Sequence, residues 1–189
     1  MSKTLPTALN LPPLDPLPDH IAKYFGICDD KLGFVPNVLA AYAFDTAKFD
    51  AFSAMYNDVM LADSGLSKLE REMIAVVVSS INKCFYCLTA HGQAVRALSN
   101  DPKLGEMLVM NWHAADLDVR QTAMLTFAEK ITKVSAETTE ADRQTLRDAG
   151  LSDRDIWVIA SVTGFFNMTN RMASATDMRP NDDYHSQNR

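Results

Sequence analysis

Apolar residues recur every three or four positions along most of the chain, which is the spacing that lines one face of an α-helix. Between positions 118 and 133, for example, the apolar residues are Ala123, Met124, Phe127, Ala128 and Ile131. No stretch shows the sustained alternation of a half-buried strand, and the β-branched run at 76–78 lies inside a helical pattern. The pattern therefore predicts an all-α fold.

Capping residues indicate where several of these helices begin. Ser67 with Glu70 has the form of a capping box before an apolar run, and Ser152 with Asp155 repeats it before a helix expected to end near position 175. A helix carrying the cysteines is expected to start near Asn82, which can cap it. The other predicted signals are Asp45, Asp101 before Pro102, Thr138 or Thr139, and Gly150 as a helix end.

Prolines divide the chain into three parts. Residues 1–18 hold five of the eight prolines, namely Pro6, Pro12, Pro13, Pro16 and Pro18. Proline removes a backbone donor and interrupts helices, so we expect residues 1–18 to form an extended arm. Residues 19–178 are expected to form a single helical domain, and residues 179–189 a C-terminal tail.

An internal similarity suggests two related helical halves. At a constant offset of 85 positions, Leu66, Ser67, Glu70, Ile74, Ala75 and Val77 correspond to Leu151, Ser152, Asp155, Ile159, Ala160 and Val162. The match is short, so both duplication and coincidence stay open. If the halves are related, only the first retains reactive groups, because Thr169 and Met172 stand where Cys84 and Cys87 would be.

Composition narrows the class of protein. The chain has 189 residues, of which 47% are hydrophobic and 22% charged, as in an ordinary globular domain. A net charge of −6 argues against a nucleic-acid or anionic-membrane surface. Neither a transmembrane span nor a signal peptide is visible, so we expect a cytoplasmic protein without a membrane partner. Three cysteines are too few, and odd in number, for a disulfide-stapled secreted domain.

Two of those cysteines form the chemical centre that the sequence predicts. Cys84, Cys87 and His91 are three and seven positions apart, which places them on one face of a helix. Near the start of that helix, unpaired N–H groups and the positive dipole end favour a thiolate, which is the reactive form of cysteine. His91, one turn beyond Cys87, can exchange its proton.

Glu72 can join this centre only if the chain bends. Twelve residues of continuous helix would separate it from Cys84 by roughly 18 Å. The segment 79–83 is the expected place for the bend. Glu72 would then orient His91 or hold a water molecule for proton transfer.

The spacing E-x11-C-x2-C-x3-H, formed by Glu72, Cys84, Cys87 and His91, resembles the active-site signature of alkylhydroperoxidase D in the carboxymuconolactone decarboxylase superfamily. The flanks resemble its peroxidase-related branch: GFVPN at 33–37, CFYCLTAHG at 84–92 and FNMTNR at 166–171. The resemblance covers residues 20–178.

This resemblance implies an all-α, antioxidant peroxidase that assembles as a trimer or hexamer and needs no metal or other cofactor. It implies that Cys87 attacks a small-molecule hydroperoxide and that Cys84 then forms a disulfide with it. A dithiol such as a lipoyl group would reduce that disulfide, and Glu72 and His91 would relay protons. One position departs from the pattern, because Tyr86 replaces a family histidine and a phenol is a poor base near neutral pH.

Several other interpretations stay open. The two thiols could be inert, could act in thiol–disulfide exchange or redox sensing without peroxidase turnover, or could bind zinc together with His91 and Glu72. A decarboxylase on a lactone acid, as in the other arm of the superfamily, is a further alternative. Packing is the expected role of Tyr86 and Cys28, structural hydrogen bonding that of Asn170, and ordinary surface or capping roles those of His20, His113 and His185.

Overall fold

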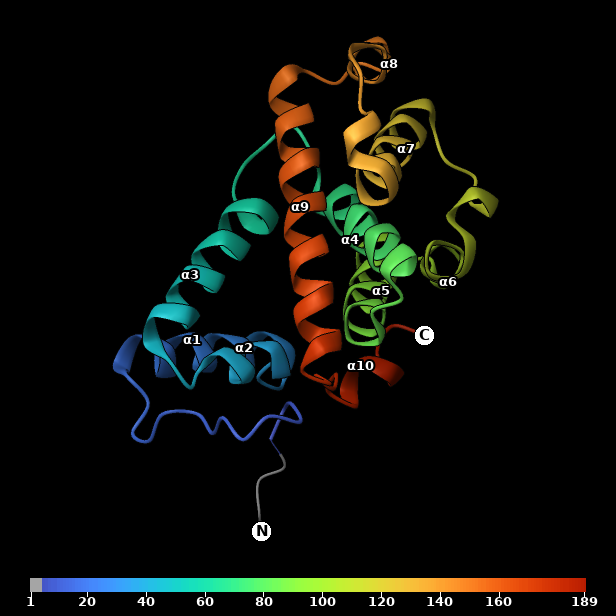
Figure 1. Cartoon of the computed structure of the whole chain (residues 1–189). Helices are drawn as coiled ribbons and strands as arrows, with labels where there is room; N and C mark the ends of the chain where they lie inside the picture. The colour runs from blue at the N-terminus through green and yellow to red at the C-terminus, as the bar shows by residue number, and fades with distance from the viewer. Residues whose placement is uncertain (1–4) are drawn as a thin grey trace.

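The computed structural model describes residues 5–189, and within that range it contains helices and no strand, so the predicted all-α fold is confirmed. A π-helical turn, Asn57–Leu61, and two short 3-10 turns, Trp112–Ala114 and Ser135–Glu137, join some of the helices. The α-helices are α1 (Asp19–Leu32), α2 (Asn37–Tyr42), α3 (Thr46–Tyr56), α4 (Lys68–Asn82), α5 (Phe85–Ser99), α6 (Pro102–Asn111), α7 (Val119–Val134), α8 (Glu140–Asp148), α9 (Asp153–Ala175) and α10 (Asp183–Ser186) (Figure 1).

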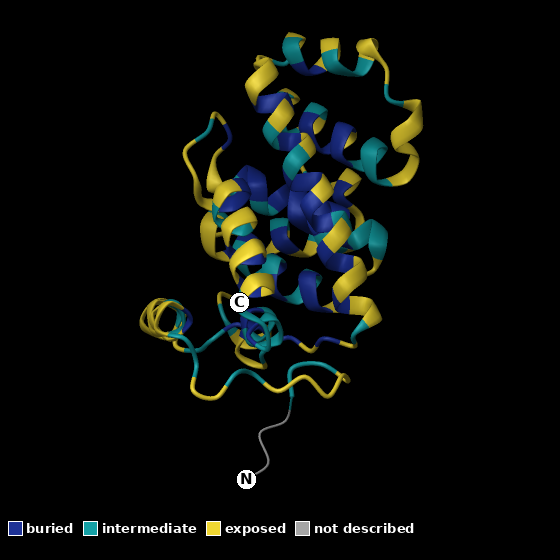
Figure 2. Ribbon diagram, turned by 60° about the vertical axis from the view of Figure 1, so that its left-hand side comes forward, coloured by how far each residue is buried: buried dark blue, intermediate teal, exposed yellow. Residues whose placement is uncertain are grey.

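The centre of the fold is α4. Every residue from position 73 to position 79 of this helix is fully buried. Helices α5, α6, α7 and α9 all pack against it, and the buried residues concentrate there (Figure 2). In the view of Figure 1, α3 lies on one side of α9 and α4–α7 lie on the other. The buried face of α4 therefore fixes the positions of the helices that carry the candidate site.

Most of the predicted helix starts are confirmed. Asp45 and Asp101 cap α3 and α6, and Ser67 and Ser152 form capping boxes with Glu70 and Asp155 at the starts of α4 and α9. Because each side chain satisfies backbone N–H groups within three residues, the signal is local and can be read from the sequence. Thr139, the second of two predicted alternatives, caps α8.

The predicted capping role of Asn82 is wrong. The apolar run of α4 continues to Asn82, which is its last residue. Lys83 then adopts a left-handed conformation with φ of 54°, and Cys84 itself is the N-cap of α5. The bend predicted between positions 79 and 83 is therefore present, but it is confined to Lys83 and Cys84.

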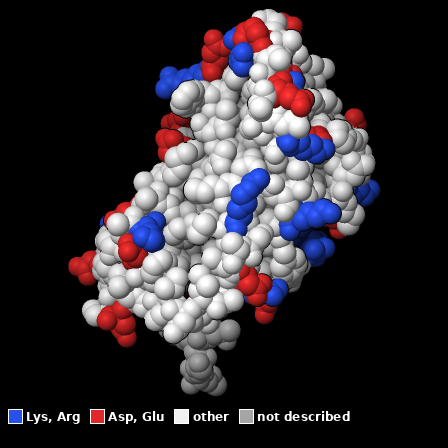
Figure 3. Space-filling view, viewed as in Figure 1, with Lys and Arg blue, Asp and Glu red and all other residues white. Residues whose placement is uncertain are grey.

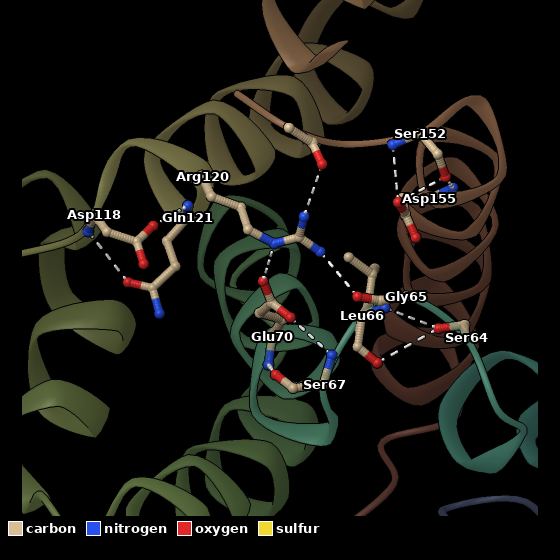
Figure 4. Close-up of polar contacts among 11 residues, drawn as sticks. Ser64, Gly65, Leu66, Ser67, Glu70, Asp118, Arg120, Gln121, Ser152 and Asp155 are labelled. Atoms are coloured by element: carbon tan, nitrogen blue, oxygen red, sulfur yellow. Dashed lines mark hydrogen bonds and ion pairs between the residues drawn. The ribbon is translucent and has the colours of Figure 1, made fainter. Parts of the chain in front are cut away.

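Arg120 on α7 joins three segments near the start of α4 (Figure 4). Its Nε donates to Oε1 of Glu70 at 2.9 Å, and its Nη2 donates to the carbonyl oxygen of Gly65 at 2.9 Å. Its Nη1 donates to the carbonyl oxygen of Gly150, between α8 and α9, at 3.3 Å. The rigid guanidinium fork thus links the start of α4, the loop before it and the turn that precedes α9.

The two ends of the described chain lie together. The N–H of Ala8 donates to the carbonyl of Thr176 at 2.9 Å, and the N–H of Arg179 donates to the carbonyl of Pro6 at 3.1 Å. Residues 5–18 of the predicted arm form no helix and contain bends at positions 6–9 and 15–16, whereas residues 1–4 lie outside the described range. The predicted tail contains the short helix α10, whose Tyr184 is buried.

Helices α4 and α9, which carry the two similar sequence stretches, pack against each other. Nδ2 of Asn82 donates to Oδ1 of Asn167, its counterpart at the offset of 85, at 3.1 Å. Duplication of the two halves stays a prediction.

On the face shown in Figure 3, acidic and basic side chains are interspersed. No helix within the described residues is long and apolar enough to cross a membrane.

Candidate active site

The two predicted cysteines meet at the junction of α4 and α5. Both are buried, and their Sγ atoms are 2.8 Å apart. Cys84 lies just before the first turn of α5, and the backbone N–H of Cys87 donates to its sulfur at 3.4 Å. A cysteine therefore takes the place that serine or aspartate usually occupies at a helix start, where the helix dipole favours a negative charge.

The environment of this pair favours one thiolate and one thiol. The hydrogen bond with the Cys87 thiol lowers the pKa of Cys84 to about 7, with help from the Cys87 backbone N–H and from His91 and against the effect of burial. The same hydrogen bond, together with burial and the charge on Cys84, raises the pKa of Cys87. The pair therefore carries at most one negative charge near neutral pH, and Cys84 is the sulfur that ionises first.

A buried amide supports both sulfur atoms. Hydrogen bonds from Asn170 on α9 lower the pKa of Cys84 and of Cys87. Its Nδ2 lies 2.9 Å from Oγ of Ser79, and its Oδ1 accepts a hydrogen bond from Asn82 at 3.0 Å. Structural hydrogen bonding was the only role expected for Asn170, although this residue lies in the family-like stretch 166–171. Its contact with the thiols depends on the packing of α9 against α4.

The bend at Lys83 brings Glu72 to His91. Nδ1 of His91 lies 2.6 Å from Oε2 of Glu72, and both side chains are largely buried. An ionised carboxylate can only accept a hydrogen bond, so Nδ1 carries the proton and Nε2 is left for another partner. The ring of Phe166 packs edge-on against the imidazole, with ring centres 4.6 Å apart. Glu72 therefore orients His91.

Tyr86 has a structural contact. Its hydroxyl oxygen accepts a hydrogen bond from the backbone N–H of Val38, in the first turn of α2, at 3.0 Å. Burial raises the pKa of this phenol well above its ordinary value. The side chain therefore links α5 to α2, in accord with the packing role expected from the sequence.

A cavity of about 490 Å³ lies in front of Cys87. Cys87, His91 and Glu72 are all in its wall, which is otherwise mainly aliphatic and aromatic and is built from α1, α2, α3, α5 and α9. Cys84 instead lines a separate pocket of about 120 Å³, together with Lys83 and Arg179. The two sulfur atoms are thus neighbours that face different spaces.

The other cysteine and the other histidines singled out in the sequence do not contact the thiol pair. Cys28, on α1, is half-buried in the wall of the large cavity and packs against the core, and burial raises its pKa. His20 pairs with Asp50 at 2.8 Å, and His113 lies 3.3 Å from Glu129. Within residues 5–189, no three His, Cys, Asp or Glu side chains converge in a way that could hold a metal ion.

Comparisons with known proteins give the family. Residues 47–130 match the model of the carboxymuconolactone decarboxylase family. A peroxidase-related protein from Silicibacter sp. TM1040 is 68% identical, with 100% of this chain and 99% of that chain covered and a TM-score of 0.96. A peroxidase-related protein with an alkylhydroperoxidase AhpD core, from Ralstonia eutropha JMP134, is 42% identical, with 100% and 98% covered and a TM-score of 0.94.

A more distant structure shares the fold alone. The debrominase Bmp8 is 18% identical, with 94% of this chain and 95% of that chain covered and a TM-score of 0.78. No curated protein matches the sequence. The full-length similarity to the two peroxidase-related proteins and the family match at residues 47–130 together show that this chain belongs to the alkylhydroperoxidase D-like group of the carboxymuconolactone decarboxylase superfamily.

Proposed function

We propose that the protein is a thiol peroxidase that reduces organic hydroperoxides, with Cys87 as the nucleophile. The observation that supports this proposal best is that Cys87 shares one cavity wall with the His91–Glu72 pair, while Cys84 lies 2.8 Å away outside that wall. A hydroperoxide in the cavity would meet the sulfur of Cys87 and a proton-exchanging imidazole together.

The first step transfers one oxygen atom. As Cys87 loses its proton, its sulfur attacks the terminal peroxide oxygen, the O–O bond breaks, and Cys87 becomes a sulfenic acid while the substrate leaves as an alkoxide. Two electrons pass from sulfur to the peroxide. The proton lost by Cys87 is returned to the alkoxide through His91, which Glu72 keeps in the required orientation.

The second step forms the disulfide. The thiolate of Cys84 attacks the sulfenic sulfur of Cys87, the S–O bond breaks, and hydroxide leaves to be protonated to water. The lowered pKa of Cys84 supports this role, because about half of the resolving sulfur is already thiolate at pH 7. A dithiol such as a reduced lipoyl group then restores both thiols by exchange and becomes oxidised itself.

The test is consumption of an organic hydroperoxide with reduced lipoamide, compared between the wild type and two matched variants. Cys87→Ala should abolish turnover. Cys84→Ala should permit one oxidation, after which dimedone labels a sulfenic acid at Cys87. Turnover that persists in Cys87→Ala, or a dimedone adduct at Cys84 in that variant, would contradict the assignment.

One observation favours a second candidate, a thiol–disulfide oxidoreductase. The sulfur with the lowered pKa is Cys84, which lines the smaller pocket rather than the cavity. In that case Cys84 would attack the disulfide of another molecule and Cys87 would complete the exchange. This function would be selected if the wild type reduces a model disulfide but does not accelerate hydroperoxide consumption. The reduction of the disulfide should then be lost in Cys84→Ala.

A further inference from the structure

We propose that the large cavity binds a long-chain carboxylic acid bearing a hydroperoxide, with its chain along α5 and its carboxylate at Lys31. The hydroperoxide part of this inference rests on the proposed function. The binding of the chain and of the carboxylate rests on the cavity itself and is tested separately.

The depth of the cavity favours a long chain. Along α5, its wall runs from Cys87 through Ala90 and Ala94 to Leu98. Eleven residues of helix separate Cys87 from Leu98, which corresponds to about 16 Å. Cys87 is only 3% exposed, whereas Leu98 is 46% exposed, so the thiol lies at the closed end and Leu98 at the mouth.

The wall is suited to an alkyl chain. A volume of about 490 Å³ lies in the range of cavities that hold ligands of drug size. Ile27 and Leu32 on α1, and Leu61 after α3, are 44%, 44% and 52% exposed at this cavity. Large apolar side chains left in water at a cavity mouth become buried when an apolar ligand covers them, which stabilises the complex. A compact hydroperoxide would leave most of this surface uncovered.

The charge at the mouth favours an anionic end group. Lys31 is the only lysine or arginine in the cavity wall, and it is exposed. It forms no ion pair within residues 5–189. The one acidic residue in the wall, Glu72, is engaged by His91. The ammonium group of Lys31 at the mouth is therefore free to pair with a ligand, whereas Glu72 inside is already paired with His91. This arrangement suits an alkyl chain with one carboxylate at its outer end.

The test measures binding without peroxide, by displacement of the fluorescent fatty acid cis-parinaric acid from the full-length reduced protein. For saturated acids of increasing length, Kd should fall by about fourfold per added methylene until the cavity is filled. Lys31→Gln should weaken the binding of acids by up to about fivefold without weakening that of their methyl esters. Lys23→Gln, an exposed position on α1 outside the cavity wall, is the matched control and should change neither.

A second variant tests the depth. Ala94 lies two turns beyond Cys87 on the same helix face, so Ala94→Phe would fill the cavity and flatten the dependence on chain length. A Kd independent of chain length in the wild type, or an equal loss for acids and esters in Lys31→Gln, would overturn the inference. Chain-length-dependent binding that Lys31→Gln weakens for acids alone, without hydroperoxide turnover, would refute the peroxidase alone and support the carboxylate site.

Discussion

Replacing Cys87 by alanine should raise the pKa of Cys84 from about 7 towards its ordinary value of 9, because the hydrogen bond from Cys87 is the main cause of the lowering. At pH 7, a thiol with a pKa of 7 is half ionised, whereas a thiol with a pKa of 9 is about 1% ionised. The thiolate population would thus fall by about 50-fold at most. Since a thiolate becomes more nucleophilic as its pKa rises, the rate of attack on a disulfide would fall by only about five- to eightfold.

The assay is the thiolate absorbance near 240 nm as a function of pH, with Cys28→Ser in every protein so that only the pair contributes. The midpoint should lie near 7 in the reference protein, so that reactivity rises with pH through this value, and it should move upwards in Cys87→Ala. Cys87→Ser retains a hydroxyl donor and should give a smaller shift. A midpoint that stays near 7 in Cys87→Ala would refute the reasoning and assign the lowering to the helix start and His91.

Three further changes test the supporting structure. Glu72→Gln keeps the size of the side chain but loses the anion that orients His91, so kcat for hydroperoxide should fall by about 10- to 100-fold; an unchanged kcat would argue against the relay. Gly65→Ala places a Cβ 2.0 Å from Oδ1 of Asp155, so this side chain must leave the position in which it forms the capping box of α9. The unfolding free energy measured in urea should therefore fall by about 1–2 kcal/mol. Asn170→Ala should cost about 1–3 kcal/mol and also raise the thiolate midpoint, which a merely structural role would not do.

The helix starts could be predicted because their signals are short. The capping box of Ser67 and Glu70 spans four residues, and the same four residues form it in the structure. The helical spacing of the apolar residues in α7 can likewise be read from that one segment of the sequence. The error at Asn82 has a physical cause, since the helix break occurs at Lys83, a residue type without any preference for the left-handed conformation that it adopts.

The site could be predicted only in part. The spacing of Cys84, Cys87 and His91 placed them together, and the resemblance to the family added Glu72. Their surroundings come from segments far apart in the sequence: Asn170 approaches from α9, and Lys31 reaches the cavity from α1. Such contacts depend on how whole helices pack, for which a single sequence carries no local signal.

The sulfur of Cys84 is both a redox group and a helix cap. Once it is bonded to Cys87, it carries no charge and becomes a poorer acceptor for the backbone N–H of Cys87, so the first turn of α5 loses part of its stabilisation. The same linkage acts in reverse, because whatever holds that turn in place favours the reduced pair. The exchange of the Cys87 amide hydrogen with solvent would thus act as a built-in reporter of the oxidation state.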